Sequence, residues 1–168
     1  MSADDFSFLG STWDRADTFI NAGDTSIRGF EFSVQTAWDN GLFAVLNYTF
    51  ADGDIDLPEN SAFGERTIPY FKQADNTGNI SFGYDKDRFD IRLAINYRSK
   101  YLDEVGDDAM SDRYVTSHMQ VDLTAKYMIT DGLQLTFSAI NINNRPESYY
   151  FGDESRLSQY DVYGTTYT

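Results

Sequence analysis

Hydrophobic and polar residues alternate along much of this chain with a period of two. The clearest run is Phe89 to Tyr101, where the odd positions are apolar apart from Ser99 and most even positions are polar or charged. Successive side chains of a β-strand point to opposite faces of a sheet, so this pattern predicts a strand with one apolar face. Similar stripes occur from His118 to Tyr127, Leu133 to Ala139, around Phe30, Leu42 to Phe50 (where Phe43 and Val45 blur the alternation), and Ile80 to Tyr84.

The links between these stripes alternate in length. Three are short and rich in turn residues, and three are long and polar. The short links are Asp39-Asn40-Gly41, Asp85-Lys86-Asp87 and Thr130-Asp131-Gly132; the long ones run roughly from Gly53 to Gln73, Asp103 to Arg113 and Asn144 to Leu157. This order is typical of a transmembrane β-barrel, which has short periplasmic turns and longer extracellular loops.

The sequence therefore predicts an all-β, antiparallel, up-and-down transmembrane β-barrel segment of about seven to eight strands. Some stripes reach the 9–11 residues that a tilted strand needs to cross a bilayer, beyond the usual 5–6 of globular proteins. The predicted strands are Thr18–Trp38, Leu42–Asp54, Ala74–Asp85, Arg88–Leu102, Tyr114–Met128, Leu133–Asn143 and Ser158–Thr168. Leu93, Ile95, Leu123 and Leu135 should share one face, and Arg92, Asn96, Asp122 and Thr136 the other.

Aromatic residues are abundant, with 12 Tyr, 13 Phe and 2 Trp. Many lie near the ends of the stripes: Tyr48, Phe50, Tyr84, Phe89, Tyr97, Tyr101 and Tyr127. Aromatic residues are favoured in strands generally. Their placement is better explained by the aromatic girdles that a membrane barrel carries at its two lipid interfaces.

Charge and length exclude several classes of protein. No stretch approaches the roughly 18 apolar residues of a spanning helix. The formal net charge of −14, from 13 Lys and Arg against 27 Asp and Glu, argues against nucleic acid as a partner. The chain has no cysteine, and Met1-Ser2-Ala3-Asp4-Asp5 does not resemble a signal peptide, so the chain is expected to be mature or an internal piece.

No catalytic, cofactor-binding or metal-ligating set can be assembled from the sequence, which argues against an enzyme. His118 is the only histidine and cannot make a tetrahedral metal site without cysteines. The acidic loop residues are Asp52, Asp54, Asp56, Glu59, Asp103, Glu104, Asp107, Asp108 and Asp112. They suit a solvated acidic loop better than calcium, whose twelve-residue loop with a bidentate Glu is missing. Glu31, Arg92, Arg98, Lys100, Asp122 and Lys126 are expected to face the barrel lumen.

Six local motifs, in order, resemble the C-terminal third of TonB-dependent outer-membrane receptors, whose barrels have about 22 strands. They are the segment from Phe19 to Glu31 with Gly29-Phe30-Glu31 at its end, Leu46-Asn47-Tyr48-Thr49-Phe50-Ala51-Asp52, Ile68-Pro69-Tyr70 with Asn76-Thr77-Gly78-Asn79-Ile80, Asn96-Tyr97-Arg98-Ser99-Lys100-Tyr101, Ala139-Ile140-Asn141-Ile142-Asn143-Asn144, and Tyr163 to Thr168. Family members continue beyond this last motif to a terminal aromatic residue, and they carry a plug domain that nothing here resembles.

The resemblance implies that residues 1–168 form a single partial domain, part of the wall and extracellular loops of an active importer in the bacterial outer membrane. The cargo would be a scarce nutrient such as a ferric siderophore, cobalamin or an oligosaccharide. The implied partners are outer-membrane lipid, lipopolysaccharide, the rest of the barrel with its plug, and TonB acting only through that plug. Two alternatives remain: a self-contained small barrel of about eight strands with a structural or adhesive role, and a soluble β-sandwich binding module.

Overall fold

A computed structural model describes residues 6–8, 11–13, 23–59 and 61–168. Among these residues every regular element is a strand, and every strand pairing is antiparallel. No helix in this part of the chain could cross a membrane. The all-β, antiparallel prediction is confirmed.

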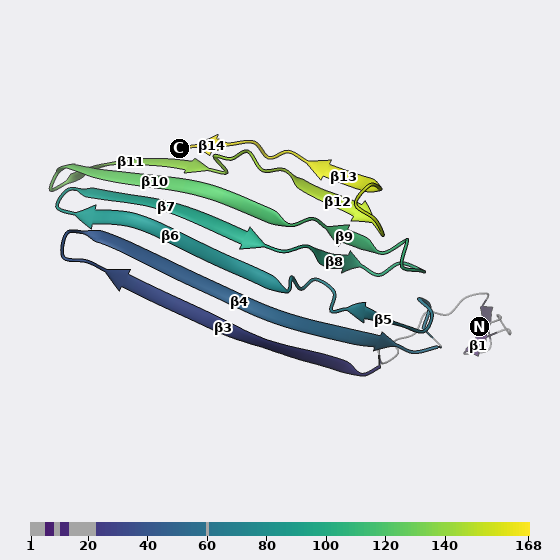
Figure 1. The fold of residues 1–168 in the computed structure, drawn as a ribbon. Helices are drawn as coiled ribbons and strands as arrows, with labels where there is room; N and C mark the ends of the chain where they lie inside the picture. The colour runs from purple at the N-terminus through teal and green to yellow at the C-terminus, as the bar shows by residue number, and fades with distance from the viewer. Residues whose placement is uncertain (1–5, 9–10, 14–22, 60) are drawn as a thin grey trace.

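The main sheet is built from six long strands and two short ones (Figure 1). The long strands are β3 (Thr25–Ala37), β4 (Leu42–Leu57), β6 (Asn76–Lys86), β7 (Phe89–Arg98), β10 (His118–Thr130) and β11 (Leu133–Ile140). Short β5 (Arg66–Pro69) pairs with β4, and β14 (Thr166–Tyr167) pairs with β11. The order β14-β11-β10-β7-β6-β4-β3 places successive long strands side by side, as the hairpin pattern predicts.

A second sheet lies at the end of the long strands that is joined by the long links, which we call the loop end. Its order is β13-β12-β9-β8, comprising β8 (Tyr101–Glu104), β9 (Arg113–Val115), β12 (Glu147–Phe151) and β13 (Leu157–Asp161). A separate hairpin joins β1 (Phe6–Phe8) and β2 (Ser11–Trp13). The three short turns lie together at the other end of the long strands, at the left of Figure 1.

The turns form for local reasons. Gly41 has a φ of +94°, which favours glycine, and the amide of Leu42 donates to Asn40 Oδ1 at 3.1 Å. The turn before β7 has Asp87 at a φ of +56°, a conformation that Asp tolerates better than most residues. The predicted short links are therefore tight hairpin turns.

The register confirms the predicted faces. Leu93 lies opposite Phe82 on one side and Leu123 on the other, and Leu135 lies opposite Tyr127. Arg92 lies opposite Thr124 on the other face, with the remaining predicted polar positions. Those positions are Asn96, opposite Gln120; Asp122, opposite Ala94; and Thr136, opposite Lys126.

The apolar face is exposed over the long strands. Phe30, Phe82 and Leu135, from three different strands, are 58%, 52% and 60% exposed. The buried core lies instead at the loop end, where Ile55, Ile68 and Leu102 pack together. A soluble β-sandwich would cover such an apolar sheet with a second layer. The described residues contain no such layer, so the apolar side chains of the long strands stay uncovered.

The boundaries of several predicted strands need correction. The first, Thr18–Trp38, is observed as β3 from Thr25; residues 14–22 lie outside the described part, and Trp38 belongs to the turn, where its carbonyl accepts from the amide of Gly41. β4 runs to Leu57 rather than ending at Asp54, because it remains paired with β3 and gains β5 as a partner. Strand β5 and strand β12 lie within links predicted to be loops.

Two predicted strands are interrupted at the same level. Arg88–Leu102 divides into β7 and β8, and Tyr114–Met128 into β9 and β10. The cause is a change of hydrogen-bond partner. Arg98 Nη1 donates to the carbonyl of Thr116 at 3.1 Å, and the amide of Thr116 donates to the carbonyl of Ser148 at 2.9 Å.

The last two predicted strands also differ from the structure. The penultimate strand ends at Ile140 rather than Asn143, because Asn141 has a φ of +56°. Ser158–Thr168 is not one strand. Its first half is β13 in the second sheet and its end is β14 in the main sheet, with Gly164 at a φ of +72° between them.

Candidate functional site: the polar face of the main sheet

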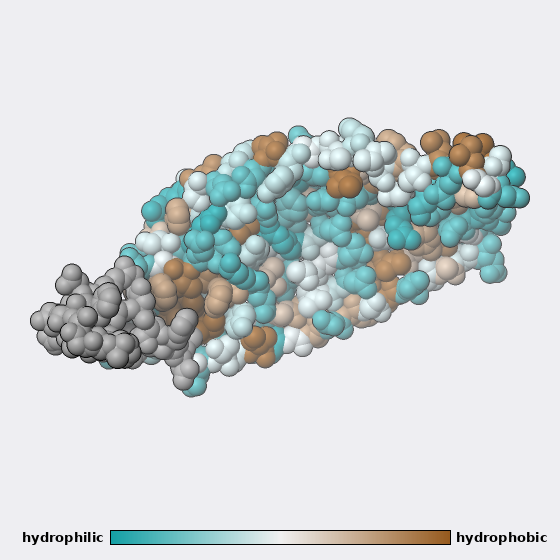
Figure 2. Space-filling model, turned by 180° about the vertical axis from the view of Figure 1, so that it is seen from behind, coloured by the Kyte–Doolittle hydropathy of each residue, from teal (hydrophilic) through white to brown (hydrophobic). Residues whose placement is uncertain are grey.

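The polar face carries a row of uncharged hydrogen-bonding side chains across five adjacent strands, which we call the polar ladder. Each member lies opposite the next in the register. The ladder consists of Ser33, Asn47, Asn79, Asn96 and Gln120. Figure 2 shows the sheet from behind the view of Figure 1; hydrophilic side chains predominate over the middle of this face, which is hollowed along its length.

Hydrogen bonds tie one half of the polar ladder together. Asn79 Nδ2 donates to Asn96 Oδ1 at 2.7 Å. Asn96 Nδ2 and Gln120 Nε2 both donate to Asp122, at 3.3 Å and 2.8 Å. The Asp122 carboxylate also accepts from the backbone amide of Asn141 at 2.9 Å. Because these contacts join three strands and the residue that follows β11, they fix the side chains of this surface in defined rotamers.

A groove of about 280 Å³ interrupts the polar ladder between Asn47 and Asn79. Thr49 and Thr77, which lie opposite one another, also line it. Asn47 accepts a hydrogen bond from Ser33 Oγ at 2.8 Å on its other side. The groove therefore offers carboxamide and hydroxyl groups to whatever lies against the polar face.

Charged groups lie on the same face toward the turns. Lys126 Nζ contacts Asp90 Oδ2 at 3.0 Å. The guanidinium of Arg92 lies 5.1 Å from the centre of the Phe43 ring, a cation–π arrangement. That ring covers Gly83, since a Cβ on Gly83 would come within 2.2 Å of it. Phe43, which blurs the alternation in the sequence, therefore serves as a platform for an arginine on the polar face.

The residues expected to face the lumen are largely found together. The register places Glu31, Arg92, Arg98, Asp122 and Lys126 on the polar face, with Arg98 ion-paired to Glu147. Lys100 lies in the interruption between β7 and β8, so strand alternation does not place it there.

His118 faces Arg98 across β7 and β10. Its Nδ1 is buried and has no hydrogen-bond partner in the described part of the chain. Within the described ranges, no three His, Asp or Glu side chains are arranged to hold a metal ion. The polar face thus supplies hydrogen bonds and charges for contact with another surface.

The acidic residues of the loops are largely engaged in structure. Asp112 is buried and accepts from Arg66 through both oxygens, at 2.5 Å and 2.7 Å. Asp108 accepts from the amides of Met110 and Ser111, and the hydrogen bonds to Ser111 lower the pKa of its carboxyl. Arg113 lies within 3.4 Å of both Asp103 and Glu104.

Asp52, Asp54 and Asp56 are part of β4 rather than of a loop. Asp52 pairs with Arg28 at 2.8 Å. Burial, and then the charges of Asp52 and Asp54, raise the pKa of Asp75 at the start of β6. These carboxylates therefore repel one another just beyond the pair of Phe50 and Asn76, where the pairing of β4 with β6 ends.

A two-faced antiparallel sheet with exposed apolar residues on one side and an ordered polar network on the other is the wall of a transmembrane β-barrel. Residues 2–144 match the family model described as TonB dependent receptor-like, beta-barrel. The chain belongs to this family of outer-membrane transporters, as its local motifs indicate. No curated protein and no solved structure matches the chain.

Sequence reasoning found the polar face but missed how it is held together. The polar ladder could have been found, because its members follow from aligning adjacent hairpins by their turns. The Arg66–Asp112 pair could not, since it joins two long links whose folding the sequence pattern does not describe.

Proposed function

We propose that this chain is part of the wall and extracellular loops of a TonB-dependent importer that takes a scarce nutrient across the bacterial outer membrane. The observation that carries the proposal is the set of exposed apolar side chains on one face of the six long strands, which we call the apolar stripe. The polar ladder lies on the opposite face of the same sheet. Lipid and lipopolysaccharide contact the stripe, and the rest of the barrel with its plug completes the structure around the polar face. Residues 1–168 then form one partial domain, and the chain acts in transport rather than catalysis.

The cargo classes that suit such an importer are ferric siderophores, cobalamin and oligosaccharides. The groove between Asn47 and Asn79 presents neutral donors and acceptors on the lumen side. Such groups can contact either a polar cargo or the backbone of a plug. Energy reaches the cargo through TonB and the plug, and this chain supplies the surface along which the plug is held.

The test uses the receptor gene that contains this chain, in its own host. Membrane fractionation should recover the protein in the outer membrane. Deletion should abolish uptake of one labelled ferric siderophore, cobalamin or oligosaccharide, and loss of TonB should abolish the same uptake. Outer-membrane recovery without TonB-dependent uptake would support the small structural barrel instead, and recovery in a soluble fraction would support the sandwich.

A further inference from the structure

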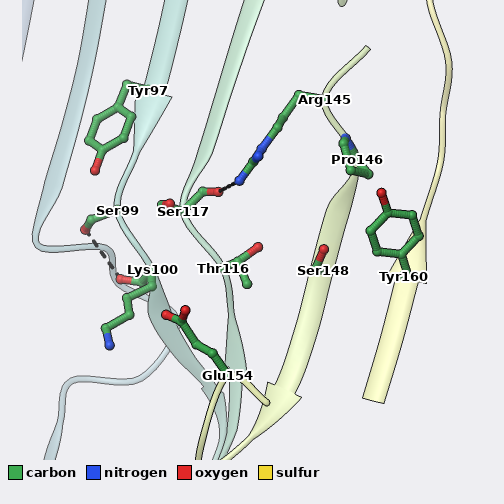
Figure 3. Close-up of a pocket in the computed structure, with 10 residues that line it drawn as sticks. All are labelled: Tyr97, Ser99, Lys100, Thr116, Ser117, Arg145, Pro146, Ser148, Glu154 and Tyr160. Carbon is green, nitrogen blue, oxygen red and sulfur yellow. Dashed lines mark hydrogen bonds between the residues drawn. The ribbon is translucent and has the colours of Figure 1, made fainter. Parts of the chain in front are cut away.

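A pocket of about 390 Å³ lies where the main sheet meets the second sheet (Figure 3). It is formed at the interruptions between β7 and β8 and between β9 and β10, and it is closed by the segment around Arg145 and by β12 and β13. Its volume is within the range of small-molecule sites in proteins.

The strand interruption that creates the pocket is built by specific contacts. The regular pairing of β7 with β10 ends at Arg98 and His118, and the pairing of β8 with β9 begins at Tyr101 and Val115. Between these levels the carbonyl of Ser117 accepts from Arg145 Nη2 at 3.1 Å. The strands therefore part because side chains replace the ladder bonds, and the space is a defined feature of the fold.

Arg145 is held in place from its backbone. Its amide donates to Asn141 Oδ1 at 2.8 Å, and its carbonyl accepts from Asn141 Nδ2 at 3.2 Å. Asn141 is buried and also donates to the carbonyl of Gly164 at 3.1 Å. Because the backbone of Arg145 is fixed and its guanidinium donates to the carbonyl of Ser117, less conformational freedom remains to be lost on binding.

The lining of the pocket carries a net positive charge, whereas the chain as a whole is acidic. Lys100 and Arg145 contribute two positive charges and Glu154 one negative charge, in a chain whose formal net charge is −14. Within the described residues, neither Lys100 nor Glu154 has an ion-pair partner within 4 Å, although both line the same pocket. The two groups are therefore available to a ligand placed between them.

Hydroxyl and aromatic groups complete the lining. Figure 3 draws the rings of Tyr97 and Tyr160 at opposite sides of the pocket, with the hydroxyls of Thr116 and Ser148 between them. Tyr side chains offer flat apolar surfaces, and the hydroxyls and Glu154 offer partners to several hydroxyl groups at once. Lys100 and Arg145 add charge-assisted hydrogen bonds for an anion.

We propose that this pocket binds a phosphorylated sugar. The sugar ring lies against a tyrosine, its hydroxyls contact Glu154 and Ser148, and its phosphate contacts Lys100 and Arg145. Tyr97 belongs to the apolar stripe, at its loop end, since it lies opposite Met119 of β10. With the membrane orientation of the proposed function, on which this placement rests, the pocket lies at the level of the outer-leaflet headgroups. The phosphorylated sugar then belongs either to a glycolipid headgroup or to a free molecule.

The experiment measures binding to the purified receptor in detergent. The probes are glucosamine 1-phosphate, unphosphorylated glucosamine and inorganic phosphate, together with vesicles with and without lipid A. We expect the phosphorylated sugar to bind more tightly than either part alone. Lys100→Gln should weaken this binding about tenfold or more, as expected for loss of a charge-assisted contact. The matched control is Lys86→Gln at the end of β6, beside the β6–β7 turn, which makes the same charge change at the other end of the sheet and should have no effect.

The proposal would be overturned if inorganic phosphate bound measurably and as tightly as the phosphorylated sugar, if neither the soluble sugar phosphate nor the lipid A vesicles bound, or if Lys100→Gln and Lys86→Gln weakened binding equally. Binding only in the lipid A vesicles identifies the glycolipid source, and binding of the soluble sugar identifies the free source; both support the site. Because uptake is not the readout, failure of this site leaves the proposed transport function standing.

Discussion

Val34 tests whether the apolar stripe faces lipid. It lies in β3 opposite Leu46, the middle of the apolar stripe of β4 from Leu42 to Phe50, and is 44% exposed. On a membrane-spanning strand this position is near the bilayer centre, where an arginine on the lipid face costs about 2–4 kcal/mol. Val34→Arg should therefore lower the folding equilibrium constant about 30- to 900-fold.

Gln35 is the matched control. It is adjacent in β3, exposed, and on the polar face opposite Val45. Gln35→Arg should change stability by no more than about 0.5 kcal/mol. Urea titration of the receptor refolded into lipid vesicles measures both variants against the parent protein.

A larger apolar residue separates lipid from a protein core. Val34→Trp should be tolerated in vesicles, because lipid can rearrange around the ring. In a close-packed core the same change would cost about 1–3 kcal/mol through overpacking. Equal effects of Val34→Arg and Gln35→Arg, or a clear loss in Val34→Trp, would refute the membrane assignment of this face.

Three further predictions concern the remainder of the structure. Asp112→Asn should destabilise the contact between the two long links by about 3–5 kcal/mol, since the Arg66 side chain, only 18% exposed, loses its ion pair; proteolysis of the loops should accelerate, with Asp107→Asn as a control that leaves them unchanged. Gly83→Ala should destabilise the receptor toward urea, because its Cβ would meet both the Phe43 ring and, at 2.6 Å, the backbone carbonyl of Ile91; Phe43→Ala in the same chain should recover only part of the loss, and a Gly83→Ala variant as stable as the parent would contradict this close packing. The lowered pKa of Asp108 means that its contribution to stability is present above the ordinary carboxyl pKa and is lost as pH falls through the lowered value; the hydrogen-exchange protection of the Met110 and Ser111 amides, relative to the intrinsic rate at each pH, should fall on acidification in the parent, and Asp108→Asn should remove that dependence.

Much of the membrane-spanning part could be predicted from the sequence because a strand with two different faces has only one acceptable register. Leu93 and Arg92 are examples, since a shift of one residue would exchange them. The loop end could not be predicted in the same way. Lys100 and Tyr101 continue the alternation of β7 past Ser99, and only contacts with the distant Arg145 and Ser148 show why the pairing stops there.

At the loop end, whether a segment forms a strand depends on the segments that pair with it. The stretch at Glu147–Phe151 has no clear alternation, and it becomes a strand because Val115 and Gln159 lie on either side of Tyr149. Phe43 was ambiguous for a different reason: an aromatic residue on a polar face is explained only by Gly83 and Arg92, which come from two other strands.

Strand β4 extends well past the lipid-facing stripe. That stripe ends near Phe50, whereas β4 continues in regular pairing to Leu57, a further rise of about 23 Å at 3.3 Å per residue. The outermost segments are therefore held by an extension of the paired strands. This extension has its own small core of Ile55, Ile68 and Leu102. The outermost segments can therefore change in sequence and length without disturbing the strands of the membrane-facing sheet.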